Sequence, residues 1–225
     1  MLKLLRNDSI KLKDYAALGL YALVRGGEHH RALDGEVTDI IAHLTILLRS
    51  NEMRSRENAC RMLAELSFDG TCRLAITQHG ALADVVELLR SGTAMAYCAS
   101  LLRAFCSGSD EDRRAVVELG GATALITTFQ QANGKCREDM LAAIADLVAN
   151  DSTTQAPLLL NAVDSVVSLL QNGSPSEMAS ATKCLGHLAF DQDSREKVCR
   201  SGGFNPPVEL LRTTSGDALN WNSHE

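Results

Sequence analysis

The 225-residue sequence predicts an all-α solenoid, in which similar helical units stack one after another. Three features recur along the chain and predict this fold: an apolar pair, a helical spacing and a turn-forming glycine. The apolar pairs begin at Leu47, Leu88, Leu169 and Leu210, and Phe129 takes the place of a missing pair, so the steps are 41, 41, 40 and 41 residues. A period near forty residues indicates stacked helical units, which present an extended surface rather than a closed pocket.

The longest segment of each unit carries apolar residues at positions i, i+3, i+4 and i+7, which places four side chains on one face of a helix. The copies are Ala16, Gly19, Leu20 and Leu23; Ala59, Met62, Leu63 and Leu66; Cys98, Leu101, Leu102 and Phe105; Met140, Ala143, Ile144 and Leu147; Ala181, Cys184, Leu185 and Leu188. We therefore expect a long helix in each unit, with this face in the core.

A short helix is expected after each long one. Its first residue should be a cap, because a side-chain oxygen there can accept from the free N–H groups of the first turn. The expected caps are Thr71, Asp112, Ser152 and Asp193. The inward apolar positions follow five residues later, at Ile76, Val117, Pro157 and Val198. Proline removes a helical hydrogen bond, so we expect a distorted helix around Pro157.

A glycine or asparagine then interrupts the chain before the second helix of the unit. These residues are Gly80, Gly121, Asn161 and Gly202. Both residue types tolerate the left-handed conformation found at helix ends, which permits a sharp turn. The apolar segment that ends in the leucine pair follows, so each unit has one short and two longer helices.

This order of helices resembles the armadillo repeat, and the sequences Leu63-Ala64-Glu65-Leu66-Ser67 and Leu185-Gly186-His187-Leu188-Ala189 carry the resemblance best. It covers essentially residues 4–225. The resemblance implies a right-handed superhelical α-solenoid with three helices per unit of about 41 residues. Residues 1–225 would form a single array of about five repeats. HEAT repeats, which have two helices and lack the Gly-Ala turn, are the alternative.

Both ends of the sequence look like partial repeats. Residues 1–7 match only the end of a leucine-pair helix, and residues 217–225 match the start of another long helix. Complete solenoids normally end in capping units with a polar outer face. We therefore expect the chain to be a fragment of a longer protein, the alternative being frayed tails on a complete domain.

Composition argues against several classes of protein. The chain has 22 Lys and Arg against 28 Asp and Glu, a net charge of −6, and lacks the basic stripe typical of nucleic-acid binding. It has no apolar run long enough for membrane insertion. Its 7 cysteines include no CxxC pair, and no secretory signal precedes them, so reduced thiols are expected. These features predict a cytoplasmic protein, with the nucleus as a further location.

We expect no catalytic, cofactor-binding or metal-binding residues, and hence no enzyme activity. The phosphate-binding and hydrolase motifs GxxxxGK[ST], GxGxxG, HExxH and GxSxG are absent from the sequence. His29 and His30 are adjacent, which does not give the i, i+4 spacing of two ligands on one helix face. Cys72 and His79 form a pair without a third group, which is weak support for a nucleophile.

The resemblance implies that function lies on the concave surface of the long helices. In family members such as importin alpha, an asparagine there clamps the backbone of an extended peptide, and a tryptophan one turn earlier forms side-chain pockets. At the asparagine position this chain has Ala22, Glu65, Ala104, Asp146 and His187. At the tryptophan position it has Leu18, Arg61, Ser100, Ala142 and Lys183. Capture of nuclear localisation signals is therefore not expected.

The remaining groove residues predict a surface of mixed charge that is acidic in the middle. The candidate partner-binding residues are Tyr15, Glu57, Arg61, Glu65, Tyr97, Ser100, Glu138, Asp139, Asp146, Lys183 and His187. The two tyrosines are included because aromatic residues are enriched in binding hot spots. The expected partner is a protein or peptide with basic residues. The alternative is that Arg61 pairs with Glu65, and Lys183 with His187, within their own helices.

The sequence therefore predicts a non-enzymatic scaffold that binds a partner protein or an extended peptide along the groove. The alternative is a substrate-recruiting or regulatory armadillo segment of a multidomain enzyme, such as a U-box ubiquitin ligase. A catalytic domain elsewhere in the same protein would distinguish the two functions.

Overall fold

The structure, a computed structural model, describes residues 2–7, 9–24, 35–150, 163–188 and 192–202. All regular structure in these ranges is helical, which confirms the all-α prediction. The chain divides into two compact units, Met1–Ala143 and Ile144–Glu225. The prediction of a single array over residues 1–225 stays a prediction.

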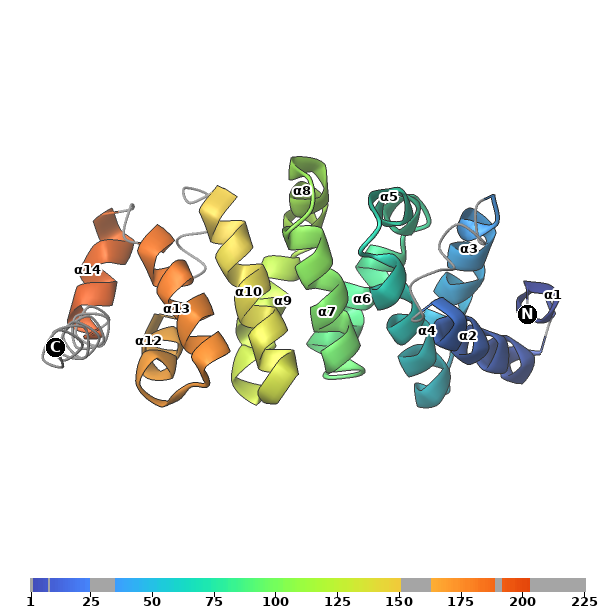
Figure 1. The fold of residues 1–225 in the computed structure, drawn as a ribbon, viewed down its shortest axis with the longest axis horizontal. Helices are drawn as coiled ribbons and strands as arrows, with labels where there is room; N and C mark the ends of the chain where they lie inside the picture. Colours follow the sequence, from blue (N-terminus) through green and yellow to red (C-terminus); the bar gives the residue numbers. More distant parts are fainter. Residues whose placement is uncertain (1, 8, 25–34, 151–162, 189–191, 203–225) are drawn as a thin grey trace, which may run out of the picture. The chain divides into compact units, whose positions relative to one another are not determined.

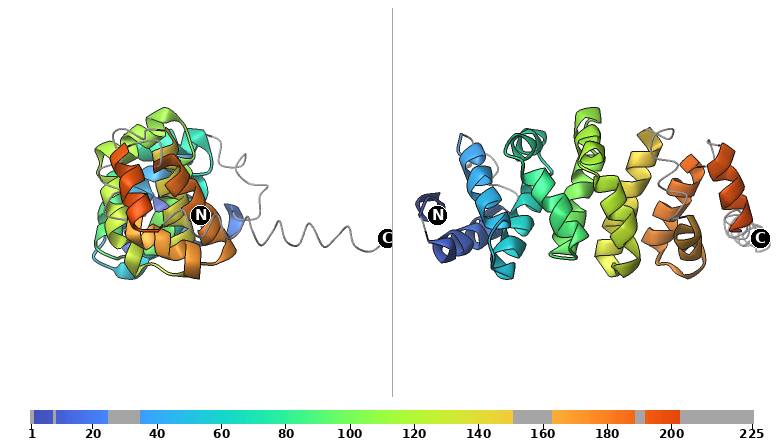
Figure 2. Two further views of the ribbon diagram at one scale, coloured as in Figure 1. Left: turned by 90° about the vertical axis from the view of Figure 1, so that its left-hand side faces the viewer. Right: turned by 180° about the vertical axis from the view of Figure 1, so that it is seen from behind.

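The first unit contains two layers of helices and a set of short helices beside them (Figures 1 and 2). One layer consists of α2, α4 and α7, and the other of α3, α6 and α9, each helix packing on the next in its layer. The short helices α5 and α8 also pack on each other. The bounds are α1 Leu2–Leu5, α2 Ile10–Val24, α3 Val37–Leu48, α4 Met53–Leu66, α5 Gly70–Gln78, α6 Ala81–Arg90, α7 Met95–Cys106, α8 Asp110–Glu118, α9 Gly121–Thr128 and the 3-10 helix η2 Phe129–Gln131.

The long helix α10 (Gly134–Asn150) crosses the boundary between the units. The second unit also contains α12 (Val163–Asn172), α13 (Pro175–Leu188) and α14 (Gln192–Arg200), and each of these packs against the other two.

The apolar face predicted for the long helices forms the core. All four predicted residues are buried in each of α4, α7, α10 and α13. In α2, Ala16 and Leu20 are buried, Gly19 is half-buried, and the side chain of Leu23 lies outside the described residues. Burial of each large side chain stabilises the fold by roughly 1.5–3 kcal/mol relative to exposure.

The recurring pairs also lie in the core. Both leucines are buried at 47–48, 88–89 and 169–170, and Phe129 is buried in η2. Phe129 therefore takes the packing role of the missing pair, as predicted. The pair at 210–211 lies outside the described residues.

The predicted caps of the short helices were wrong where the structure describes them. Asp69 caps α5, because its carboxylate accepts from the backbone N–H groups of Thr71 and Cys72 at 2.8 and 3.1 Å. Ser109 caps α8 and forms a reciprocal capping box with Asp112. Thr71 and Asp112 thus lie inside the first turn. The pattern S-x-x-D was a signal that could have identified Ser109. Ser152 and the side chain of Asp193 lie outside the described residues.

The predicted alignment of equivalent positions between repeats is also wrong by one residue in α8 and in the turn after it. Val116, not Val117, is fully buried, and Gly120, not Gly121, has the left-handed conformation, with φ of 72°. A Cβ on Gly121 would lie 2.7 Å from the side chain of Val116, so the close approach of α8 and α9 requires glycine there. The spacing from α5 to α8 is thus 40 rather than 41 residues.

The other predictions for these positions are confirmed where they can be compared. Ile76 and Val198 are fully buried, and Gly80 and Gly202 have positive φ. Pro157 and Asn161 lie outside the described residues.

Candidate interaction site on the long helices

The candidate site in the first unit is a set of side chains on the long helices α2, α4, α7 and the first part of α10. We call it the long-helix face and define it by residues that are not fully buried: Tyr15, Tyr21, Glu57, Arg61, Glu65, Tyr97, Ser100, Arg103 and Glu138. Tyr15 is 61% exposed, whereas Glu57, Glu65, Tyr97, Ser100 and Glu138 are half-buried. Most of the predicted groove residues of this unit are therefore accessible. Asp139 is the exception, because it is buried.

Arg61 lies between two tyrosine rings that come from different helices. Its guanidinium carbon is 5.4 Å from the ring centroid of Tyr21 on α2 and 4.9 Å from that of Tyr97 on α7. Arg61 Nε also donates a hydrogen bond of 2.9 Å to the Tyr97 hydroxyl. A cation within about 6 Å of an aromatic centroid is attracted by the ring face. Arg61 thus connects α2, α4 and α7.

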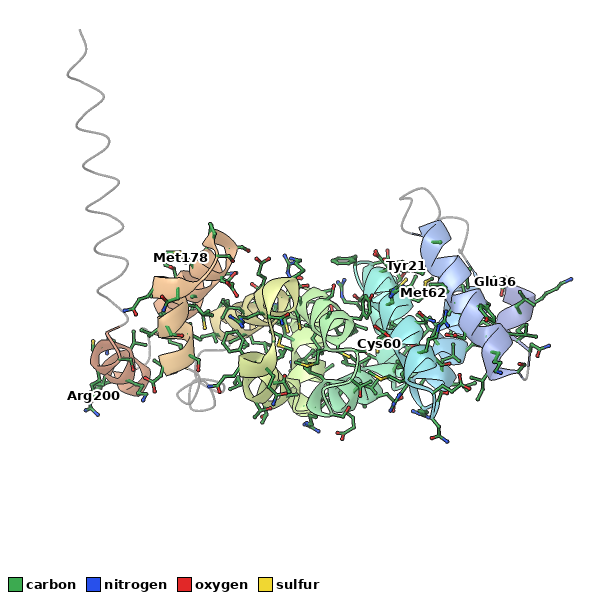
Figure 3. All side chains as sticks on the ribbon, turned by 90° about the horizontal axis from the view of Figure 1, so that it is seen from below. Tyr21, Glu36, Cys60, Met62, Met178 and Arg200 are labelled. Atoms are coloured by element: carbon green, nitrogen blue, oxygen red, sulfur yellow. The ribbon has the colours of Figure 1, made fainter. Side chains whose placement is uncertain are left out.

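Tyr21, which is labelled in Figure 3, was not among the predicted site residues. It is half-buried and stands directly before Ala22, one of the positions aligned with the family's peptide-clamping asparagine. This adjacency was the signal that could have pointed to it.

The alternative of an Arg61–Glu65 pair within α4 is not what the structure contains. Arg61 points to Tyr97 instead, although Glu57 and Glu65 are each four residues away on the same helix. Neither glutamate makes a hydrogen bond or ion pair with the residues that the structure describes. Two half-buried glutamates that have no partner in the described part of the chain therefore lie one turn before and one turn after Arg61 on α4.

Asp139 is a buried carboxylate that pairs with two more exposed cations. Its Oδ1 lies 2.8 Å from Arg103 Nη1 on α7 and 3.0 Å from Lys135 Nζ on α10. Glu138 is farther from Lys135, at 3.8 Å. Because the Asp139 carboxylate is buried and has two cationic partners, it connects α7 to α10 and is less accessible to a partner than predicted.

The candidate residues of the second unit also form a contact between helices. Lys183 Nζ on α13 lies 2.6 Å from Asp146 Oδ1 on α10. This pair replaces the contact between Lys183 and His187 that was considered within α13. His187 is half-buried and has an interaction of its own.

The cysteines in the described ranges are free thiols, most of them in the core. Cys60 Sγ and Cys98 Sγ lie 3.8 Å apart between α4 and α7. The hydrogen bond with Cys60 and burial both raise the pKa of Cys98. Burial is the main cause that raises the pKa of Cys72 to about 11 and that of Cys184 to about 12. Since the thiolate is the reactive form, these side chains behave as apolar core residues.

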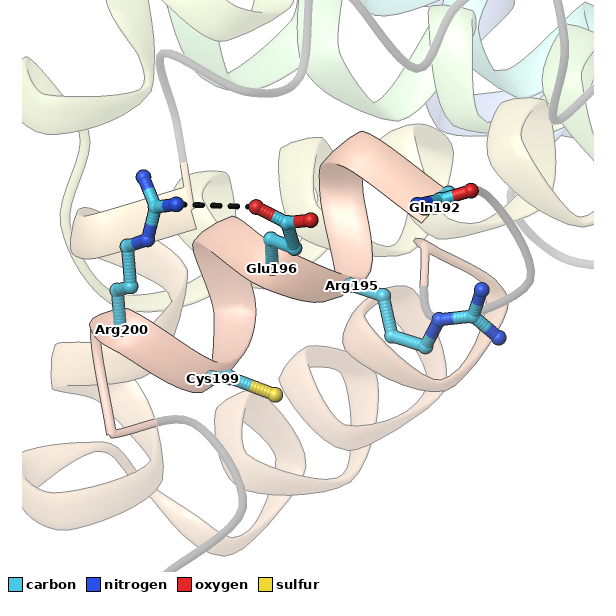
Figure 4. Close-up of a pocket in the computed structure, with 5 residues that line it drawn as sticks. All are labelled: Gln192, Arg195, Glu196, Cys199 and Arg200. Atoms are coloured by element: carbon cyan, nitrogen blue, oxygen red, sulfur yellow. Dashed lines mark hydrogen bonds and ion pairs between the residues drawn. The ribbon is translucent and has the colours of Figure 1, made fainter.

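Other types of site receive little support from the described part of the chain. Its histidines, cysteines and acids form no group of three that could hold a metal ion. None of its helices combines the length and apolar character needed to cross a membrane. An open depression of about 560 Å³ lies along α14 (Figure 4). Its lining residues are Gln192, Arg195, Glu196, Cys199 and Arg200. These described lining residues all belong to this one helix.

Comparison with known proteins identifies the class of fold. No family model matches the sequence. The chain is 24% identical over 233 residues to Protein CELLULOSE SYNTHASE INTERACTIVE 3 of Arabidopsis thaliana, a match that covers 95% of the chain and 11% of the relative. The chain therefore spans only a small part of the length of that relative.

Solved structures with the same architecture are α-solenoids. A computationally designed armadillo repeat protein for modular peptide recognition has a TM-score of 0.82 at 19% identity, with 93% of this chain and 90% of that chain covered. A designed armadillo repeat protein in complex with the peptide (KR)4 has a TM-score of 0.79 at 19% identity, over 93% and 89%.

A third structure, from work on the interaction between cadherin and β-catenin, has a TM-score of 0.85 at 19% identity. It covers 94% of this chain and 41% of that chain. The chain is thus an α-solenoid. More specifically, it has the armadillo-repeat fold, as the resemblance implied.

Proposed function

We propose that this chain is a non-enzymatic protein-interaction module, and that the long-helix face of its first unit binds a basic, extended segment of a partner protein. The observation that carries the proposal is the pair of half-buried carboxylates on α4, Glu57 and Glu65, which have no partner among the described residues. Lysine and arginine side chains form charge-assisted hydrogen bonds with such groups, and these bonds strengthen when water is partly excluded.

The relatives support this class of function. One designed armadillo protein carries the peptide (KR)4, which consists of lysine and arginine alone. Another structural neighbour comes from work on the interaction between cadherin and β-catenin. The relative found by sequence, Protein CELLULOSE SYNTHASE INTERACTIVE 3, is named for an interaction with cellulose synthase. We place the function in the cytoplasm or nucleus, in keeping with the free thiols.

The proposal is tested by titrating the protein with the peptide (KR)4 and comparing two double variants. The first, Glu57→Gln with Glu65→Gln, removes both carboxylates and keeps the side-chain volumes. The second, Glu111→Gln with Glu118→Gln, removes two exposed charges from the short helix α8 and gives the same net charge. It is therefore a matched control for long-range electrostatic attraction.

We expect the Glu57 and Glu65 variant to bind the peptide about thirtyfold more weakly than the wild type, because two charge-assisted contacts of about 1 kcal/mol each are lost. The α8 variant should bind nearly as well as the wild type. Equal losses in the two variants would mean that net charge alone attracts the peptide, and the proposed face would be wrong.

A further inference from the structure

Arg61 occupies the position in which a ligand cation would sit. Its guanidinium lies between the rings of Tyr21 and Tyr97, at 5.4 and 4.9 Å from their centroids. Both rings are half-buried, so the attraction of their faces for a cation is screened less than at a fully exposed site. The two tyrosines thus form a cation site that the chain itself fills.

The two tyrosines bind Arg61 through few contacts, given how many hydrogen bonds an arginine side chain can donate. Among the described residues, its side chain makes one hydrogen bond, from Nε to the Tyr97 hydroxyl, and no described carboxylate pairs with the guanidinium. Arginine can donate five N–H bonds, so most of its donor capacity is unused by the described residues. A competing cation would therefore have to replace one hydrogen bond and two ring contacts.

A displaced Arg61 would have two acceptors within reach on its own helix. Glu57 and Glu65 lie four residues before and four residues after it, the spacing at which side chains of a helix meet. The order of glutamate before arginine, as in Glu57 and Arg61, is the more favourable one along the helix. Ion pairing with either carboxylate would offset the loss of the tyrosine contacts.

We propose that Tyr21 and Tyr97 form a receptor for a lysine or arginine side chain of a partner, and that Arg61 occupies this receptor until the partner displaces it onto Glu57 or Glu65. The inference rests on the proposed function, since it concerns the same face and the same class of ligand. It adds a regulatory step: Arg61 competes with the partner and sets the affinity of the site.

The test compares binding of the peptide (KR)4 by the wild type, Arg61→Ala, and two further variants made in the Arg61→Ala background, Tyr97→Phe and Tyr97→Leu. The last three proteins have the same net charge, so differences among them report the tyrosine rather than electrostatic repulsion by Arg61. Circular dichroism melts of all four proteins establish that the variants compared are folded.

We expect Arg61→Ala to bind the peptide about tenfold more tightly than the wild type, because the internal competitor and its charge are removed. Adding Tyr97→Phe should keep most of this gain, since the ring remains. Adding Tyr97→Leu should abolish a large part of it. If the Tyr97→Phe and Tyr97→Leu variants kept the same gain in affinity, the gain would come only from removal of the Arg61 charge. That result would overturn the proposed receptor.

A second probe separates this inference from the proposed function. Tetramethylammonium is a cation without N–H donors, so it reports ring contacts independently of carboxylates. Its binding to Arg61→Ala is followed by the NMR shifts of the tyrosine ring protons. Ring shifts in Arg61→Ala that are absent in the wild type would support the receptor even if no variant bound the peptide.

If instead Glu57 and Glu65 affect peptide binding as proposed while Arg61→Ala gives neither a gain nor ring shifts, the receptor is wrong and the proposed function stands. If no protein binds either probe, both proposals fail.

Discussion

Asp139 and Arg103 form an ion pair of 2.8 Å that connects α10 to α7, and the Asp139 carboxylate is only 5% exposed. A buried carboxylate is costly to leave without a counter-charge. The other cation, Lys135, lies 3.0 Å away but its side chain is 69% exposed, against 44% for Arg103. The two cations should therefore differ in their contribution to stability.

We predict that Arg103→Ala lowers the free energy of unfolding by about 2 kcal/mol, which is less than the roughly 3–5 kcal/mol for breaking a fully buried pair, because Arg103 is itself partly solvated. Lys135→Ala should cost less than about 1 kcal/mol. Urea unfolding at neutral pH measures both. A larger loss for Lys135→Ala than for Arg103→Ala would contradict this assignment of partners.

A core substitution tests the packing of the long helices. Leu102 on α7 is completely buried, so Leu102→Ala should leave a cavity and lower the free energy of unfolding by roughly 2–5 kcal/mol. The matched control is Leu74→Ala on α5, where the side chain is 59% exposed. The control should change stability by less than about 0.5 kcal/mol. Similar effects of the two substitutions would show that the register of α7 is wrong.

The sequence predicted the core better than the helix ends, for a physical reason. The four-residue apolar face of α7 repeats with the helical period, and all its members are buried, because burial depends on a regular spacing. The cap of α5 depends instead on a single residue, Asp69, and an error of two residues moves the assignment to Thr71. Terminal residues of helices are the least regular part of the pattern.

The sequence predicted most residues of the candidate site but not the contacts between them. The sequence identified Arg61 and Tyr97, yet their pairing depends on which residues of neighbouring repeats meet across the helix layer. Tyr21 completes the stack from a third helix, 40 positions before Arg61 in the numbering. The spacing of residues along one helix does not determine how side chains from three helices meet. From the sequence, Glu65 on the same helix was therefore as suitable a partner for Arg61 as the two tyrosines.

The cap of α5 gives a pH-dependent prediction. Hydrogen bonds from the Thr71 hydroxyl and from the backbone N–H of Cys72 lower the pKa of Asp69 in the folded protein. Asp69→Ala should therefore cost about 1 kcal/mol at neutral pH, the usual effect of losing an N-cap. Because the folded pKa is the lower one, the ionised Asp69 stabilises the fold above the unfolded pKa, and this contribution is lost as pH falls through the folded pKa.

The measurement is the difference in unfolding free energy between the wild type and Asp69→Ala across the acid range. This difference should shrink as the pH is lowered below the ordinary pKa of an aspartate, 3.8. Thr71→Ala is the control, because it removes one donor to the cap but leaves the carboxylate in place, and its cost should be smaller. A difference that stays constant with pH would mean that the carboxylate is not the capping group.

Thiol reactivity should separate the core cysteines from Cys199. Cys199 is exposed on α14, whereas Cys184 is buried and its pKa is raised to about 12. The thiolate is the species that reacts with iodoacetamide, so Cys199 should be alkylated at neutral pH within minutes to hours, and Cys184 only after unfolding. Mass spectrometry of peptides from native and urea-unfolded protein measures this order.

The same raised pKa values predict loss of stability at alkaline pH. Between the ordinary thiol pKa of 9.0 and the folded values of about 11 for Cys72 and about 12 for Cys184, the unfolded chain releases these protons while the folded chain retains them. The free energy of unfolding therefore falls as pH rises above 9.0. Cys184→Ala, which removes one such thiol, should show a shallower decrease than the wild type. Parallel curves for the two proteins would show that the Cys184 thiol is not shielded from water in the folded state.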